Sequence, residues 1–441
     1  MRAVLVLVLV AGLGALGVVE IATRAIARRS CQDEMPGLSA RNAFYGWGHV
    51  PGASGWTQRC LDGKPEWRTH VRINAEGRRD REIPYARTTA ERILVLGDSF
   101  ADGLQVDLDA IVSKRLERAL NGPDPPGTHV EVVNAGVWGW GTDNALLYFV
   151  HEGWRYRPDV VLLMFDTGND VLENHRPLVT SSVTYPDKPY YRLVDGRLVR
   201  EHYPLPPAPR LQSSAVRLYR ALAPHSAFVR RLGNVSFVWR YLQGPAVPEP
   251  GLAATKPGEV YLRDYPASWR EAWRITRGLV LRLQQVVEAR GARFAVVVLN
   301  GREEVSPHRM QVMRAFNPEL AAADLDPDKP NRLIGRFLAR RGIPTIPLLD
   351  AFRARFAADG TPGFFERDIH WTAAGHALAA ERIERGLYEL GLVPRSAGFG
   401  RHPPRRRRRR RRNPSPDGPG RRGTRRYTRV VLRIDRPGRL A

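Results

Sequence analysis

The chain has 441 residues and a formal net charge of +24, and 43% of its residues are hydrophobic, which is enough for a sizeable core. Residues 396–441 hold 17 Arg and 2 Asp, so the rest of the chain is only mildly basic. The high net charge therefore comes mainly from the tail and does not by itself indicate nucleic-acid binding, which we do not expect. The length fits one large domain with insertions, or two domains.

Residues 3–19 form an uncharged apolar segment, AVLVLVLVAGLGALGVV. Its length lies near the short end for a membrane span and also suits the apolar region of a signal peptide. No convincing small-x-small cleavage site follows, so we expect residues 1–30 to be an uncleaved membrane anchor. Arg2 precedes the segment, whereas three arginines follow it at positions 24, 28 and 29, a distribution that weakly favours a cytoplasmic body.

Residues 31–90 contain Pro, Gly, Trp and charges with little periodicity, and we interpret them as a juxtamembrane collar. Only residues 69–74 alternate in the way that predicts a short strand. The two cysteines of the chain, Cys31 and Cys60, lie in this collar and form no Cys-x-x-Cys motif. They are compatible with a disulfide in an extracytoplasmic compartment and equally with two unrelated thiols.

An alternating pattern of strands and helices begins at residue 91 and predicts a parallel sheet with right-handed crossovers. The predicted strands are 91–96, 129–134, 159–165, 293–299 and 343–348, and the predicted helices are 107–120, 143–154, 269–290, 331–341 and 373–390. The rhythm is lost in residues 171–266, which predict a long insertion with short helices at 214–223 and 227–242. Insertions of this length commonly form lids, binding surfaces or disordered loops.

The tail from residue 395 to 441 is dominated by Arg, Pro and Gly and includes an unbroken arginine run at 405–412. Such a composition cannot bury a core, so we expect the tail to be disordered. Binding to anionic polymers or lipid headgroups is one hypothesis for it. An idle tail, even a frame-shifted end of the reading frame, is the favoured alternative.

Four short polar motifs lie at the ends of predicted strands or in the loops after them. They are Gly97-Asp98-Ser99, the stretch from Asn134 to Gly139, Gly168-Asn169-Asp170 and Asp368-Ile369-His370. The carboxyl ends of parallel strands are where ligands bind in open α/β sheets. Alone, Gly-Asp-Ser fits a serine that merely caps the next helix just as well. The four motifs together contain every group that acyl transfer needs.

In this hypothesis Ser99 attacks the carbonyl, His370 takes its proton and Asp368 holds the imidazole in the required tautomer. The backbone N–H groups of Ser99 and Gly139 and the side-chain amide of Asn169 would bind the oxyanion. Gly136 and Gly141 are less favoured alternatives to Gly139. We expect no cofactor. We also expect no metal, because His376 is six residues from His370 and would face elsewhere on a helix.

The four motifs resemble those of the SGNH (GDSL) hydrolase family, whose blocks contribute Ser, Gly, Asn and His in the chain order found here. The resemblance spans residues 92–392 without the insertion, and residues 72–103 with the apolar N-terminal segment look like membrane-anchored bacterial members. It implies a three-layer α/β/α sandwich in residues 91–394, with a mostly parallel, five-stranded, flavodoxin-like sheet. It also implies that the body lies outside the cytoplasmic membrane, in the periplasm or at the cell surface.

One position departs from the family pattern. Many members place Asp three residues before the histidine, where this chain has Arg367. Asp368 lies two residues before His370, a spacing that resembles relatives acting on alginate and similar exopolysaccharides. The two spacings aim the carboxylate differently, so Asp368 is the least secure member of the predicted triad.

Three tryptophans flank the motifs: Trp138, Trp140 and Trp371. Their rings would suit stacking on sugars or clamping of acyl chains, although core packing is the commoner reason for Trp at such positions. The leading functional hypothesis is a serine esterase that cleaves an acyl ester, carried by a small molecule, a glycan or a lipid. The alternatives are an O-acyltransferase acting on an extracytoplasmic polysaccharide and an anchored binding protein with a vestigial site. The intact Ser, Asn and His argue against the latter.

Overall fold

The computed structural model describes residues 12, 14–24, 31, 33–35, 37–87, 89, 91–122, 130–179, 188–201, 218, 221–222, 225–229, 257–361 and 363–394. All of them fall within the compact unit that ends at Ser396. The predicted tail lies outside the described residues, as do most of the apolar segment and most of the two predicted insertion helices. In the part of the chain that is described, no helix is both long and apolar enough to cross a membrane.

The core of the fold is a five-stranded sheet in the order β11-β10-β7-β5-β6, in which every neighbouring pair is parallel. The strands are β5 (Glu91–Gly97), β6 (Val130–Gly136), β7 (Val160–Phe165), β10 (Arg293–Val298) and β11 (Thr345–Pro347). The strand order reverses between β5 and β7, as in flavodoxin-like folds, and such a reversal opens a crevice at the carboxyl ends of the strands. The predicted α/β class and five-stranded sheet are confirmed, and the described sheet is entirely parallel.

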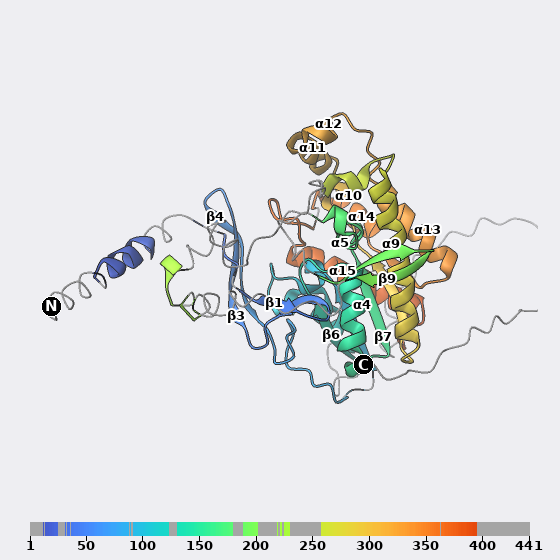
Figure 1. Cartoon of the computed structure of the whole chain (residues 1–441), viewed down its shortest axis with the longest axis horizontal. Helices are drawn as coiled ribbons and strands as arrows, with labels where there is room; N and C mark the ends of the chain where they lie inside the picture. The colour runs from blue at the N-terminus through green and yellow to red at the C-terminus, as the bar shows by residue number, and fades with distance from the viewer. Residues whose placement is uncertain are drawn as a thin grey trace, which may run out of the picture. The chain divides into compact units, whose positions relative to one another are not determined.

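Helices cover both faces of the sheet, because successive residues of a buried strand point to opposite sides. Ile93 and Val95 of β5 join one apolar cluster, whereas Leu94 and Leu96 join the other. The first face is covered by α3 (Val112–Asn121), α14 (Leu349–Asp359) and α15 (Ala373–Glu389). The second is covered by α4 (Thr142–His151), α9 (Ala267–Glu288) and α13 (Lys329–Arg341), with α4 and α9 side by side (Figure 1). The result is the predicted three-layer sandwich.

Two predicted helices differ in their bounds. The pattern at 107–120 contains a 3₁₀ turn, Leu108–Ala110, before α3 begins, because Ile111 between them is extended. The pattern at 143–154 divides into α4 and a second 3₁₀ turn, Gly153–Tyr156. Between β10 and α13 lie three helices that were not predicted: α10 (Arg302–Val305), α11 (Pro307–Phe316) and α12 (Pro318–Ala321). Helix α14 was not predicted either.

The collar contains two antiparallel hairpins, although its sequence shows little periodicity. They are β1 (Ser39–Asn42) with β2 (Gly46–His49), and β3 (Ser54–Leu61) with β4 (Lys64–Arg72). In β4 the buried residues alternate as Trp67, Thr69 and Val71, so the short strand predicted at 69–74 in fact begins earlier. A third hairpin, β8 (Tyr190–Val194) with β9 (Arg197–Glu201), lies in the insertion.

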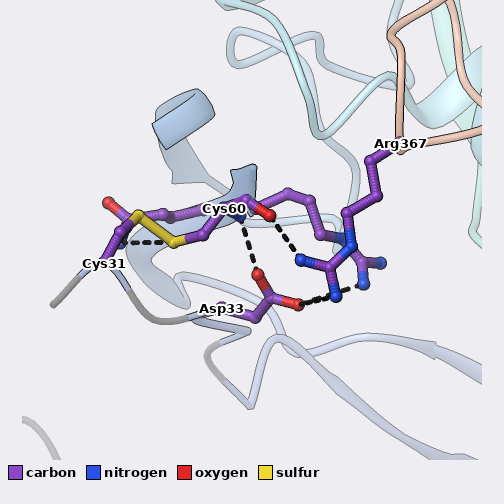
Figure 2. Close-up of a disulfide and its surroundings, with 6 residues drawn as sticks. Cys31, Asp33, Cys60 and Arg367 are labelled. Atoms are coloured by element: carbon purple, nitrogen blue, oxygen red, sulfur yellow. Dashed lines mark hydrogen bonds and ion pairs between the residues drawn. A yellow bond between two sulfur atoms is a disulfide. The ribbon is translucent and has the colours of Figure 1, made fainter. Parts of the chain in front are cut away.

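Cys31 and Cys60 form a disulfide with Cα atoms 5.8 Å apart, so the alternative of two unrelated thiols is wrong (Figure 2). The bond attaches the chain that enters the collar to β3. Because 29 residues separate the two cysteines, the crosslink restricts a sizeable loop of the unfolded chain. The collar is thereby fixed at its start and beside the turn of its longer hairpin.

The short helix α2 (Ser99–Asp102) follows β5 and packs directly on the end of β6. A Cβ atom added to Gly136 would lie 2.5 Å from Cβ of Ala101 and 2.6 Å from the backbone nitrogen of Asp102. Real Cβ atoms do not approach so closely, and neither neighbour is a flexible side-chain end. Only glycine therefore allows β6 to end beneath α2.

We predict that Gly136→Ala lowers the free energy of unfolding by about 1–3 kcal/mol or more, since α2 and β6 would have to separate. Gly335→Ala is the matched control: Gly335 lies inside α13, and no atom comes within 4 Å of its added Cβ. That control should raise the stability by up to about 1 kcal/mol, because alanine favours the helix. Urea unfolding of both variants checks the prediction, and equal effects would contradict it.

Candidate active site

Ser99 is the first residue of α2 and lies where β5 turns into the helix. The side chain of Asp98 caps this helix by accepting a hydrogen bond from the Phe100 N–H at 2.9 Å. Ser99 therefore caps nothing itself, which removes the alternative role considered for Gly-Asp-Ser. Its side chain is half-buried at the carboxyl edge of the sheet.

His370 and Asp368 reach Ser99 from the other end of the chain. The Oγ atom of Ser99 lies 2.7 Å from Nε2 of His370, and Nδ1 of His370 is in hydrogen-bond contact with Oδ1 of Asp368. The structure thus brings together the three residues predicted as nucleophile, base and orienting acid. This chain of contacts allows a proton to pass from the hydroxyl to the imidazole.

The two-residue spacing between Asp368 and His370 is compatible with this contact because the carboxylate turns back onto the following backbone. Oδ1 of Asp368 also accepts a hydrogen bond from the backbone N–H of His370 at 3.0 Å. Aspartate side chains readily form this local bond two residues ahead. Ile369, between them, is pushed outward and is 53% exposed. Arg367 points elsewhere and donates to the carbonyl of Cys60.

The Asp368 carboxylate is buried, but its neighbours stabilise its ionised form. Burial raises its pKa, but the hydrogen bonds from His370, the charge of His370 and the nearby Arg59 outweigh burial and lower the pKa to about 2. Nε of Arg59 is 3.7 Å from Oδ2, and the indole Nε1–H of Trp67 donates to the same oxygen at 3.0 Å. Asp368 is therefore a stable anion beside the imidazole.

The predicted oxyanion donors lie in two loops that are tied to the Ser99 turn. Gly139 has a φ of +72°, a left-handed conformation that favours glycine. Within the described residues, the backbone N–H groups of Ser99 and Gly139 have no hydrogen-bond partner, as an oxyanion site requires. Neither alternative glycine is needed to supply a donor: Gly136 lies under α2, and Gly141 is the residue before α4.

Asn169 lies after β7, and its amide nitrogen already has two acceptors. It donates to Oδ2 of Asp98 at 3.3 Å and to the carbonyl of Trp140 at 3.1 Å. One of these two hydrogen bonds would therefore have to break before the Asn169 amide could bind an oxyanion. The same contacts hold the amide beside the Ser99 turn, because Asp98 is the residue preceding Ser99.

A cluster of acidic residues lies behind Asn169. Burial raises the pKa of Asp98 well above its usual value, and the nearby carboxylates of Asp166 and Asp170 raise it further. Burial also raises the pKa values of Asp166 and Asp170. Asp170 accepts from the hydroxyl of Thr142 at 2.6 Å, and Asp166 accepts from the N–H of Gly168 at 2.7 Å. These bonds fix the loop that carries Asn169.

The hairpin β1–β2 braces the loop that carries Gly139. Nε2 of His49 lies 3.0 Å from Oδ2 of Asp102, the last residue of α2, and the same oxygen accepts from the backbone N–H of Trp138 at 3.2 Å. Nδ1 of His49 is 3.3 Å from Oγ of Ser39, which also accepts from the indole of Trp138 at 2.9 Å. Helix α2 and the Gly139 loop are thereby fixed to one carboxylate.

Two of the three predicted substrate tryptophans belong to the core. Trp140 and Trp371 are 1% and 0% exposed, so neither ring offers a face to a substrate. The Trp371 ring stacks on Phe352, and the Trp140 indole donates to the carbonyl of Trp47. The substrate role predicted for both is corrected to core packing. Trp138 is only half-buried and remains a candidate for substrate contact.

The described residues contain no cluster of His, Cys, Asp and Glu suited to a metal ion. His376 is fully buried, and its Nδ1 accepts a hydrogen bond from the backbone N–H of Val112 at 3.2 Å. Burial lowers its pKa to about 3, with a contribution from the nearby Arg79. This imidazole is therefore a neutral hydrogen-bond acceptor that connects α15 to α3.

Three collar residues that reach the site were not predicted from the sequence. Trp67, Arg59 and Glu66 all come from β3 and β4 and contact Asp368 or its backbone. The period-2 pattern recognised at 69–74 extends back through Trp67 and was the available signal for a half-buried strand. Nothing in that pattern indicates what the buried face contacts.

One known protein family matches the part of the chain that contains Asp368 and His370. Residues 263–399, which include Asp368 and His370, match the family described as the SGNH hydrolase-like domain of the acetyltransferase AlgX. No curated protein matches the chain. The match covers less than half of the chain, and it shows that this segment is similar to an SGNH hydrolase-like domain.

Several solved structures are similar in a general way. An acetyl xylan esterase, AlAXEase, is 11% identical with a TM-score of 0.36, covering 67% of this chain and 99% of its own. A catalytic mutant of the acetylxylan esterase Axe2 from Geobacillus stearothermophilus is 13% identical with a TM-score of 0.35, covering 68% and 95%. A GDSL-like lipase from Bacteroides thetaiotaomicron is 9% identical with a TM-score of 0.33, covering 70% and 93%. The sequence identities and TM-scores are too low for these structures to indicate a function.

We predict that Asp368 stabilises the fold at all pH values above about 4. A depressed carboxyl pKa contributes stability that is complete above the unfolded value, 3.8, and is lost as the pH falls through the folded value, about 2. The difference in melting temperature between wild type and Asp368→Ala should therefore shrink only below pH 4. Thermal unfolding between pH 8 and pH 3 checks this. A difference that disappears already between pH 7 and pH 5 would contradict the low pKa.

Proposed function

We propose that the SGNH hydrolase-like domain of this chain is a serine esterase that cleaves an acyl ester. The observation that carries the proposal is the unbroken contact from the Ser99 hydroxyl through His370 to the ionised Asp368. A hydroxyl becomes a useful nucleophile when a positioned base can take its proton. The same contact weighs against a vestigial site in a binding protein.

In the proposed reaction the Ser99 oxygen attacks the ester carbonyl while its proton moves to Nε2 of His370. Asp368 stabilises the imidazolium that forms. The N–H groups of Ser99 and Gly139, together with the Asn169 amide, stabilise the negative oxygen of the tetrahedral intermediate. The leaving alkoxide then takes the proton from His370. A water molecule, deprotonated by the same imidazole, attacks the acyl carbonyl; the bond to the Ser99 oxygen breaks, the acid is released, and the Ser99 oxygen takes the proton back from His370.

Acyl transfer is the second candidate, and the description of the matched family favours it, since that domain belongs to an acetyltransferase. The chemistry up to the acyl-serine would be identical. The two reactions differ only in whether water or an acceptor hydroxyl, such as that of a sugar, attacks the acyl-serine. The half-buried indole of Trp138 would suit stacking on a sugar ring in that step.

We expect Ser99→Ala and His370→Ala each to lower the hydrolysis of an aryl acetate by several orders of magnitude, because a triad acts as a unit. His308→Ala is the matched control, since His308 is exposed on α11. Its turnover should equal that of the wild type, and all three variants should remain folded, as their thermal melting transitions show. Near-normal turnover in either site variant would overturn the assignment.

The same assay separates hydrolysis from transfer when an oligosaccharide acceptor is added. An esterase releases acid at a rate that the acceptor does not change. A transferase places the acyl group on the acceptor, and the product is detected by mass spectrometry. Ser99→Ala should abolish either product, so acylated acceptor formed by that variant would exclude both proposals for this site.

We also propose that the residues from Cys31 onward lie outside the cytoplasmic membrane. The disulfide supports this location, because such bonds persist in oxidising compartments and are rare in the cytosol. Alkaline phosphatase, which is active only after export, should be active when fused after residue 394. Cys31 and Cys60 should resist alkylation until a reductant is added. An inactive but stably produced fusion would show a cytoplasmic body instead.

A further inference from the structure

The hairpin β3–β4 makes direct contact with the loop that holds Asp368 and His370, although the hairpin precedes the α/β domain in the chain. The indole of Trp67 donates to Oδ2 of Asp368 at 3.0 Å. The carboxylate of Glu66 accepts the backbone N–H groups of Arg367 at 2.7 Å and of Asp368 at 3.1 Å. Three hydrogen bonds therefore connect two adjacent residues of β4 to the residues just before the histidine.

The hairpin is itself held in place at its other strand. Asp33 accepts from the backbone N–H of Cys60 at 2.7 Å and from the guanidinium of Arg59 at 3.1 Å. Arg367 donates to the carbonyl of Cys60 and lies 3.8 Å from Asp33. Figure 2 shows these contacts gathered around the disulfide. The turn end of the hairpin, the disulfide and the loop before Asp368 thus form one connected set of residues.

The two oxygens of Asp368 have separate tasks. Oδ1 receives the imidazole and the backbone N–H of His370, whereas Oδ2 faces the hairpin and accepts from Trp67. The side chain of Asp368 is 2% exposed, so solvent cannot replace a lost donor freely. Without the indole N–H, Oδ2 would keep only the longer contact to Arg59, whose Nε is 3.7 Å away and whose side chain is 39% exposed. The plane of the carboxylate, and with it the imidazole, would then be less well defined.

We propose that Trp67 is a positioning residue of the esterase site: its indole N–H fixes the Asp368 carboxylate so that His370 is aimed at Ser99. The inference rests on the proposed function and adds a residue from outside the α/β domain to it. Glu66 supports the same arrangement by holding the backbone on which Asp368 is carried. The collar is then a working part of the site rather than a spacer.

The test uses Trp67→Phe in the full-length protein, because phenylalanine keeps an aromatic ring in the core and removes only the N–H donor and the second ring. Trp56→Phe is the matched control: Trp56 lies on β3 of the same hairpin, is 47% exposed and contacts His70 and Arg68 instead of the site. Aryl acetate hydrolysis gives kcat and KM, and a fluorophosphonate probe reports the reactivity of Ser99.

We expect Trp67→Phe to lower kcat and the labelling rate by about 10- to 100-fold, since small misplacements of catalytic groups have effects of this size. KM should stay within about twofold, because Trp67 does not touch the substrate, and Trp56→Phe should match the wild type. Glu66→Gln, which changes a half-buried surface side chain, should lower the labelling rate several-fold and serves if Trp67→Phe does not fold. Unchanged labelling in both site variants would overturn the inference.

A readout independent of catalysis separates this inference from the proposed function. The low-field proton resonance of the His370 imidazole N–H, bonded to Asp368, should be present in the wild type and in Trp56→Phe. It should shift or broaden away in Trp67→Phe. Wild-type protein that neither hydrolyses esters nor reacts with the probe would refute the esterase, while this resonance would still decide the positioning role. A resonance unaffected by Trp67→Phe would refute that role.

Discussion

The carboxylate of Asp368 is the point on which the arrangement of the site depends. A buried anion is tolerated only when its oxygens have donors, and here the donors come from opposite directions. His370 supplies one side and the collar hairpin supplies the other. The α/β domain, the collar and the loop before α15 must therefore be correctly placed together before this charge is satisfied.

Buried polar contacts also explain how a four-residue helix can hold a nucleophile. Helix α2 is too short to be stable by itself, and its ends are satisfied from outside. Asp98 caps its first turn, and the buried guanidinium of Arg79 donates to the carbonyls of Asp102, Gly103 and Val106 at its end. Burial lowers the pKa of Arg79 to about 10, which still leaves it charged at neutral pH. Close packing of α2 against Gly136 also holds the helix in place.

The sequence was informative where local pattern determines structure. Buried parallel strands are continuous apolar runs, and their carboxyl ends share one edge. The sequence pattern alone therefore assigns Ser99, Gly139 and Asn169 to that edge. The spacing of Asp368 and His370 was ambiguous because side-chain direction after a strand depends on the turn. The alternating pattern at 69–74 predicted only a strand. No local pattern indicates that Trp67 contacts Asp368, because the two residues are 301 positions apart. For Trp140 and Trp371, composition could not distinguish a ring facing the core from one facing a cleft.

The order of these groups along the chain has a consequence for biosynthesis. The Trp67 indole and the Ser99 hydroxyl are made early, whereas their partners Asp368 and His370 follow 301 and 271 residues later. Contacts between such distant residues form late and slowly, after the intervening chain has closed its loops. A chain that has not been synthesised as far as His370 therefore lacks the base that the proposed mechanism assigns to Ser99. In the proposed enzyme the site therefore stays inert until nearly all of the α/β domain has been synthesised.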